Sequence, residues 1–293
     1  MTEEGKIFDF SPNEEYVDDR SQLVIFFQVL ARKFWKLISV NLIYLLFNIP
    51  AILISFFIAT FMVLPFMPTI VDSASHSDLF TFLLVGTFPI LMFLMAVPVI
   101  TVGPAQAGLS YLLRCYSYEL PTFDWSDFKD KMKENLKQGL AIGLINLFAI
   151  VFLMIDFYLY SRFIGNSTFI SIANGILIVV LIVFLMMNLY LYPMMVTYKL
   201  KLKDLYKNAL LFSFAKFLPN LAVLILCFFL IMAPILLVNM TGSVLVLTLT
   251  YVFYIILGFS LPGYISSFFI NPVIDKYINP INLPNKDAKE VEK

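Results

Sequence analysis

The feature that most constrains this chain is a long stretch without any charged residue, from Phe217 to Ile274. The hydrocarbon core of a bilayer is about 30 Å thick, and a helix crosses it with about 20 apolar residues. The stretch is too long for a single crossing, and a polar insert at 239–243 divides it into two. Backbone groups in lipid must bond within the chain, so the stretch predicts two transmembrane helices.

The rest of the chain continues this pattern. Hydrophobic residues make up 60% of the 293 residues and charged residues only 14%, whereas a soluble domain is nearer half apolar and a quarter charged. We predict an all-α polytopic helix bundle with about six transmembrane helices. The predicted spans are 37–64, 79–102, 139–160, 175–196, 218–238 and 244–267. They form a domain at 23–267, between an acidic cytoplasmic tail at 1–22 and a polar cytoplasmic tail at 268–293.

Basic residues orient the spans. Lys and Arg beside short loops mark the cytoplasmic side of a membrane. Of the twenty Lys and Arg residues, all but Arg162 lie before the first span, between spans two and three, between spans four and five, or after the sixth. The sequence therefore predicts a multi-pass protein of the cell membrane with both termini in the cytoplasm. The formal net charge is zero, so we expect no nucleic-acid partner.

Three cytoplasmic segments share an amphipathic pattern. Each carries polar or basic residues at steps of four, which places them on one face of a helix. These residues are Gln28, Arg32 and Lys36 in the first segment, Lys129, Lys133 and Lys137 in the second, and Lys199, Lys203 and Lys207 in the third. Such helices suit a membrane interface, with the basic side chains toward lipid headgroups or a partner. Three repeated units of surface helix and transmembrane hairpin would explain the pattern, and so would the topology rule alone.

Few residues carry chemistry. The only histidine, His76, stands in a predicted outer loop, and no nucleotide-binding, zinc-protease or nucleophile motif is present. We predict no enzyme activity and no catalytic, cofactor-binding or metal-binding residues. Cys115 and Cys227 are predicted to be packing residues. Asp156 is the main charged residue within a span, and it is placed near the outer interface, where Arg162 could pair with it.

Other polar and small residues in the spans predict packing roles. The asparagines are expected to bond between helices or, less simply, to line a polar cavity. They are Asn41, Asn48, Asn146 and Asn188. Four small residues within two helical turns are expected to let helices approach closely at the inner membrane edge. They are Gly103, Ala105, Ala107 and Gly108.

The segment 102–145 reads VGPAQAGLSYLLRCYSYELPTFDWSDFKDKMKENLKQGLAIGLI. Its Gly-Pro with small residues, its Glu-x-x-x-Phe and its amphipathic helix with Lys-x-Asn resemble the YesL-like family of bacterial membrane proteins. Tyr192-Pro193, Asn208-Ala209-Leu210 and Leu218-Pro219 extend the resemblance loosely over 25–225. That family is found mainly in Gram-positive bacteria and has no defined molecular function. The resemblance implies a genomic neighbourhood of ATP-binding-cassette carbohydrate importers and their sensor kinases.

Three functions remain open on the sequence. The first is an accessory or regulatory subunit associated with carbohydrate uptake by an ATP-binding-cassette importer, docked through the inner face. The second is a transport permease, because the segment 208–219 resembles the coupling loop of importer permeases, although it lacks the central glycine. The third is a structural or stress-linked protein whose lysine faces bind anionic lipid.

Overall fold

The computed structural model describes residues 21–49, 103–161, 168–198 and 200–278, with the pairs 52–53, 56–57 and 59–60. Every regular element within these residues is a helix, which confirms the all-α prediction. The helices are α1 (Gln22–Phe47), α6 (Gly103–Ser117), α7 (Asp124–Glu134), α8 (Leu136–Ser161), α9 (Thr168–Thr197), α10 (Leu202–Ala215), α11 (Phe217–Thr241), α12 (Val244–Ile256) and α13 (Ser260–Ile278).

Three of these helices, α8, α9 and α11, are long and apolar enough to cross a membrane, and the bent pair α12–α13 makes a fourth if it is one span. At about 1.5 Å per residue, even the shortest of the three, α11 with 25 residues, is about 37 Å long. The predicted third, fourth and fifth spans fall inside α8, α9 and α11. The first predicted span, 37–64, begins inside α1, which ends at Phe47 and is not among these candidate spans. Much of its remainder and all of the second predicted span, 79–102, lie outside the described residues, so the described part does not reach a count of six.

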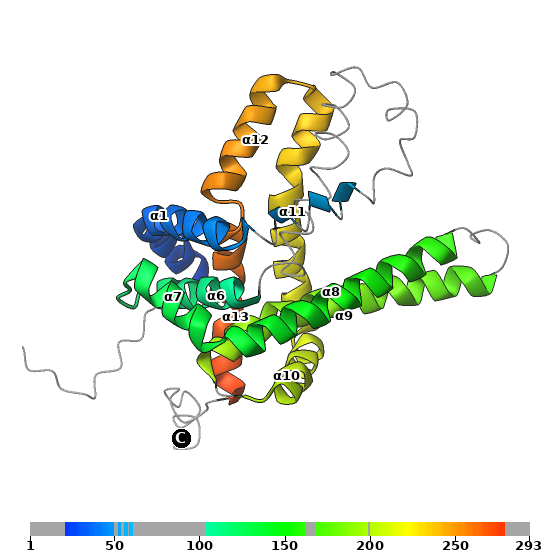
Figure 1. The fold of residues 1–293 in the computed structure, drawn as a ribbon, viewed down its shortest axis with the longest axis horizontal. Helices are drawn as coiled ribbons and strands as arrows, with labels where there is room; N and C mark the ends of the chain where they lie inside the picture. The colour runs from blue at the N-terminus through cyan, green and yellow to red at the C-terminus, as the bar shows by residue number, and fades with distance from the viewer. Residues whose placement is uncertain are drawn as a thin grey trace, which may run out of the picture.

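The long helices form two hairpins. Figure 1 shows the α8–α9 and α11–α12 hairpins leaving a common base in different directions, and α1 crossing the opposite side of that base. The second hairpin turns at Gly242, whose φ of +58° closes α11 in the left-handed conformation that glycine adopts without strain. Both hairpins expose large apolar side chains, among them Phe148 and Phe229, as expected of helices surrounded by lipid.

The predicted sixth span is not one straight helix. α12 ends at Ile256 and α13 begins at Ser260, with a bend of 50° between them. α13 then continues to Ile278, past the predicted domain boundary at 268, and it buries Ile270 and Ile274. Residues 268–278 are thus packed helix, whereas the sequence analysis places them in a polar tail.

The base consists of α6 and the helix segments packed against it. These segments come from α1, α7, α8, α9 and α13. The small residues of α6 explain how five helices approach it: Ala105 and Ala107 are fully buried. A Cβ atom built on Gly103 would lie 1.7 Å from the backbone oxygen of Gly139 in α8, and one on Gly108 would lie 2.8 Å from the backbone oxygen of Phe128 in α7. The prediction that small residues permit close helix packing here is confirmed.

The closest of these approaches yields a stability test. Gly103→Ala is expected to destabilise the protein by about 1–3 kcal/mol, because α6 and α8 must move apart to admit the methyl group. Gly175→Ala in α9 is the matched control, since nothing lies within 4 Å of a Cβ atom there. The control is expected to be neutral or stabilising by up to about 1 kcal/mol, because alanine favours a helix over glycine. Thermal unfolding in detergent measures both, and equal midpoints would contradict the packing.

Candidate functional site: a capped helix break beside a pocket

The break between α12 and α13 leaves backbone groups without helical partners. The last carbonyls of one helix and the first N–H groups of the next have no partner of their own within a helix. In apolar surroundings each such unpaired group costs several kcal/mol. α12 has 13 residues and is therefore only about 20 Å long, which is too short to cross a bilayer. If the α11–α12 turn lies at one membrane surface, the break lies within the membrane.

Asn41 of α1 satisfies both sides of this break. Its side chain is fully buried. The amide nitrogen donates to the backbone oxygens of Tyr254, at 3.2 Å, and Ile255, at 2.7 Å. The amide oxygen accepts from the backbone N–H groups of Phe259, at 3.0 Å, and Ser260, at 2.9 Å. One asparagine thus caps the end of α12 and the start of α13 together, which confirms that Asn41 bonds between helices.

The chain turns at the break because of a glycine. A Cβ atom on Gly258 would lie 2.7 Å from the Cα atom of Tyr254, so a larger residue would not fit the turn. The Tyr254 hydroxyl donates to the backbone oxygen of Ile231, which holds the end of α12 against α11. Pro262 follows in the first turn of α13, where a missing N–H removes no helical hydrogen bond.

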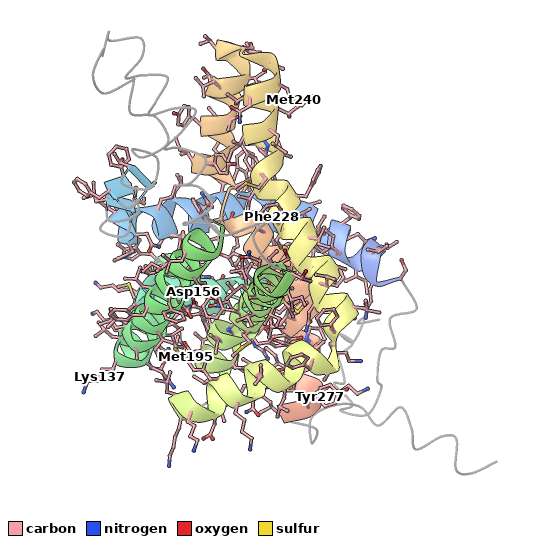
Figure 2. The ribbon with its side chains drawn as sticks, turned by 90° about the vertical axis from the view of Figure 1, so that its right-hand side faces the viewer. Lys137, Asp156, Met195, Phe228, Met240 and Tyr277 are labelled. Atoms are coloured by element: carbon pink, nitrogen blue, oxygen red, sulfur yellow. The ribbon has the colours of Figure 1, made fainter. Side chains whose placement is uncertain are left out.

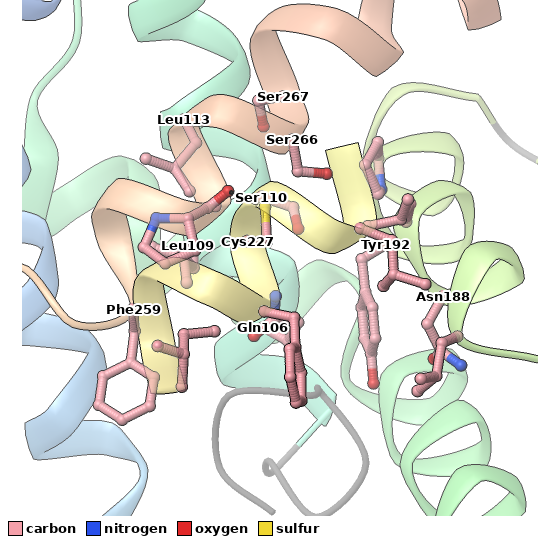
Figure 3. A pocket seen from close by; sticks show the side chains of 18 of the residues that line it. Gln106, Leu109, Ser110, Leu113, Asn188, Tyr192, Cys227, Phe259, Ser266 and Ser267 are labelled. Atoms are coloured by element: carbon pink, nitrogen blue, oxygen red, sulfur yellow. Dashed lines mark hydrogen bonds between the residues drawn. The ribbon is translucent and has the colours of Figure 1, made fainter. Parts of the chain in front are cut away.

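A pocket of about 410 Å³ lies beside the break, between α6, α9, α11 and α13 (Figure 3). Gly258 and Phe259 of the break line it directly. Most of its wall is apolar, and its uncharged polar side chains come mainly from α6, α9 and α13. These polar residues include Gln106, Ser110, Asn188, Tyr192, Ser266 and Ser267. A largely apolar pocket with a few polar groups is the usual form of a small-molecule site.

Three further asparagines tie neighbouring helices, whereas the Asn48 side chain donates within its own helix. Asn146 of α8 donates to Asn188 of α9 at 2.6 Å, so both bond between helices as predicted, and Asn188 also lines the pocket. Asn48 donates to the backbone oxygen of Tyr44 in the preceding turn. The sequence analysis missed Asn220, which accepts from the Tyr190 hydroxyl at 2.6 Å and donates to the backbone at the end of α10.

A charged cluster joins the ends of three segments in the base. Arg114 of α6 donates to both carboxylate oxygens of Asp275 in α13, at 2.8 and 2.9 Å. The hydroxyls of Tyr118 and Tyr198 each donate to the same carboxylate at 2.6 Å. Burial and the hydrogen bond to Asp275 raise the pKa of Tyr198 to about 12, so it stays a neutral donor at physiological pH. Sequence reasoning missed this cluster, although the helical spacing of Ile270, Ile274 and Ile278 signals a buried helix face.

The three predicted basic faces have different surroundings. Arg32 of α1 pairs with Glu119 at 2.9 Å, and Lys36 donates to the Thr122 hydroxyl at 2.9 Å and pairs with Asp124 at 3.5 Å. The first face thus binds the segment between α6 and α7 of the same chain. The lysines of the second and third faces that the structure describes are exposed. We call this set the lysine surface: Lys129, Lys133 and Lys137 of α7 and α8, with Lys203 and Lys207 of α10.

The remaining predicted residues are spread apart. Asp156 lies in α8, part-exposed, five residues before that helix ends at Ser161 (labelled in Figure 2). Its predicted partner Arg162 and the histidine His76 lie outside the described residues. Cys115 and Cys227 are both buried free thiols, as expected of packing residues. Burial raises the pKa of the Cys115 thiol, which keeps it in its unreactive form.

Residues 37–157 match the profile of a family described as a protein of unknown function, DUF624. The YesL-like proteins fall within that family, so the coarser part of the sequence resemblance is supported. The match covers less than half of the chain, and it includes α6 and α7, most of α8 and the last part of α1 from residue 37. No curated protein and no solved structure is significantly similar to the chain.

The first prediction from the site concerns the cap. Asn41→Leu is expected to destabilise the protein by at least about 3 kcal/mol, because up to four buried backbone groups lose their partner at about 1–3 kcal/mol each. Leu42→Ala, at the exposed neighbouring position, is the control and is expected to have little effect. Thermal unfolding in detergent measures the difference. A midpoint for Asn41→Leu close to that of Leu42→Ala would show that the amide does not hold the break.

The second prediction concerns the charged cluster. Arg114 and Asp275 are each about four-fifths buried, so removing one partner leaves the other as an uncompensated buried charge. A double-mutant cycle with Arg114→Gln and Asp275→Asn should return a coupling free energy of about 0.5–3 kcal/mol. The pair Lys131 and Glu134, one turn apart in α7 with side chains 27% and 55% exposed, provides a more solvated comparison with a smaller coupling. Equal coupling in the two pairs would contradict the importance of burial.

Proposed function

We propose that this chain is a cell-membrane protein of the YesL-like kind, with six spans and both termini in the cytoplasm. The broken pair α12–α13 supplies one span, α8, α9 and α11 supply three, and the predicted spans 37–64 and 79–102 supply the rest. The position of both tryptophans supports placing the base at a membrane surface, and the basic residues beside it favour the cytoplasmic side. Trp35 of α1 and Trp125 of α7 are exposed at the base, and tryptophan is enriched where a membrane meets water. The lysine surface then faces the cytoplasm.

The three-unit architecture belongs to the same proposal. α7 precedes the α8–α9 hairpin, and α10 precedes the α11–α12 hairpin, so two units have the expected order of surface helix and hairpin. The first part of α1, up to Lys36, would introduce the third, and residues 37–47 at the end of α1 would begin the predicted span 37–64. The basic face of α1 binds other segments of the same chain, so in this unit the face stabilises the base.

We propose that the protein acts as a non-catalytic accessory or regulatory subunit in carbohydrate uptake by an ATP-binding-cassette importer. The observation that carries the proposal is the contrast between the basic faces. The side chains of Arg32 and Lys36 bind within the chain, whereas the lysine surface is left exposed on two different helices. The two helices are linked, because Gln138 at the start of α8 donates to the backbone oxygen of Leu200 just before α10. A single acidic surface of an importer could therefore contact both.

A permease is the second candidate, and the helix break favours it. Transporters place substrate sites where transmembrane helices are interrupted. The pocket beside the break, however, is lined mainly by apolar side chains, while a sugar requires a hydrogen-bonding partner for most of its hydroxyls. The pocket therefore suits a carbohydrate poorly, and the accessory role is the better account of the exposed lysines. Binding of anionic lipid by the same lysines is the third candidate.

The docking proposal is tested by recovery of partners. The protein is purified in mild detergent from cells grown on complex glycans, and co-purifying proteins are quantified by mass spectrometry. Importer subunits are expected with the wild-type chain. The triple variant Lys133→Gln, Lys137→Gln and Lys207→Gln should reduce their recovery by about tenfold, because three exposed ion pairs at about 0.5 kcal/mol each give that factor.

The matched control replaces the same three lysines by arginine, which keeps the charge and should keep the partner. Absence of importer subunits from the wild-type preparation would overturn the proposal. Recovery that is unchanged in the glutamine variant, with a parallel loss of binding to anionic liposomes, would favour the lipid candidate instead.

A further inference from the structure

The pocket beside the break has a second chemical property that the docking proposal does not use. Among the described residues none that lines it is charged, although they come from α1, α6, α9, α11, α13 and the break itself. Its apolar wall comes mainly from α9 and α11. That wall includes Ile182, Leu185, Leu189, Leu221, Leu224 and Met232. An ionised ligand group would lose its hydration there without a compensating charge, so the pocket selects against ions.

The pocket is continuous with the surface that would face lipid. Ile225 and Phe228 of α11 line it, and their side chains are also 58% and 50% exposed on the outside of the same helix. Counting about 1.5 Å per residue from Phe217, the lining part of α11 from Leu221 to Met232 lies about 6–23 Å from its basal end. That interval falls within the thickness of a bilayer core of about 30 Å. A molecule entering between these side chains would come from the membrane.

We propose that the pocket binds one acyl chain of a bilayer phospholipid, while the headgroup stays outside. The uncharged, mainly apolar wall matches an alkyl chain, and the volume of about 410 Å³ is in the range of small-molecule sites. The polar lining does not oppose this occupant, because a serine hydroxyl in a helix can bond the backbone oxygen of the preceding turn. This inference goes beyond the proposed importer role and is independent of the lysine surface.

The bound chain would contact the break that Asn41 caps. Phe259 lines the pocket with its side chain, and its backbone N–H is one of the four groups that Asn41 holds (Figure 3). Gly258 lines the pocket at the turn itself. An acyl chain in this place would fill apolar space against the interrupted backbone, and so it would stabilise the bent arrangement of α12 and α13.

The experiment uses the full chain reconstituted in vesicles of phosphatidylglycerol and phosphatidylethanolamine. A trace of phosphatidylcholine with a diazirine at the end of one acyl chain is added, activated by light, and its adducts are mapped by mass spectrometry. Adducts are expected on Leu109, Ser110 or Leu113 of α6. These residues line the pocket but are at most 5% exposed, so lipid that only surrounds the outside of the protein cannot reach them.

Two variants two residues apart on α11 form a matched pair. Leu224→Trp fills the pocket and should reduce the α6 adducts about tenfold, equivalent to 1.4 kcal/mol of binding free energy. Leu226→Trp lies on the exposed face outside the pocket and should leave them unchanged. If Leu224→Trp does not fold, Ser266→Leu serves as a second filling variant and Leu224→Ala, which enlarges the pocket, should keep the adducts.

Three results would overturn the proposal. The first is adducts confined to outward-facing residues of the hairpins in the wild-type protein. The second is α6 adducts of equal intensity in the filling variants and in Leu226→Trp. The third is labelling of α6 by a photoactive free fatty acid but not by the phospholipid.

Discussion

The backbone at the break between α12 and α13 has to find hydrogen bonds that the helices themselves do not supply. Asn41 supplies them from another helix, with its nitrogen on one side of the break and its oxygen on the other. Because the carboxamide is fixed by both ends, α1 cannot shift relative to the broken pair without exposing unpaired groups in apolar surroundings. This contact links the position of α1 to the bend and to the pocket beside it.

The second constraint is the close packing of helices on α6, which its small residues permit. Gly103 and Gly139 let α6 and α8 touch at the backbone, and Gly108 gives α7 the same access. The far end of α6 carries Arg114, which reaches α13 through Asp275. Close backbone contact at one end and an ion pair at the other hold α6 in the middle of the base. The same helix forms one wall of the pocket.

Length and absence of charge were sufficient to predict α8, α9 and α11, because a bilayer span needs little beyond those two properties. The packing role of the small residues of α6 could also be predicted, since their spacing places them within two helical turns. The break could not be predicted from the sequence, because Asn41 bonds to residues more than two hundred positions away. Gly258 alone resembles many glycines in transmembrane helices. The role of Asp275 was hidden by its place after the last charge-free stretch, where charged residues usually begin a tail.

The basic faces also show what a sequence pattern does not predict. All three segments carry a similar pattern in the sequence, but only tertiary contacts decide which cations remain available. Glu119 and Thr122 occupy the first face, and no pattern within residues 28–36 indicates this. Local periodicity therefore predicts a helical face, while its availability to a partner is a property of the whole fold.

The two long-range contacts also impose an order on biosynthesis. The ribosome makes Asn41 and Arg114 early, whereas their partners near the break and at Asp275 emerge with the last helices. Until then, an amide and a guanidinium that the finished protein buries must find substitutes in water, headgroups or insertion machinery. Assembly of the base is therefore completed only when α13 packs. A nascent chain that stops before α13 keeps two polar groups without their final partners, and these groups distinguish it from the finished protein.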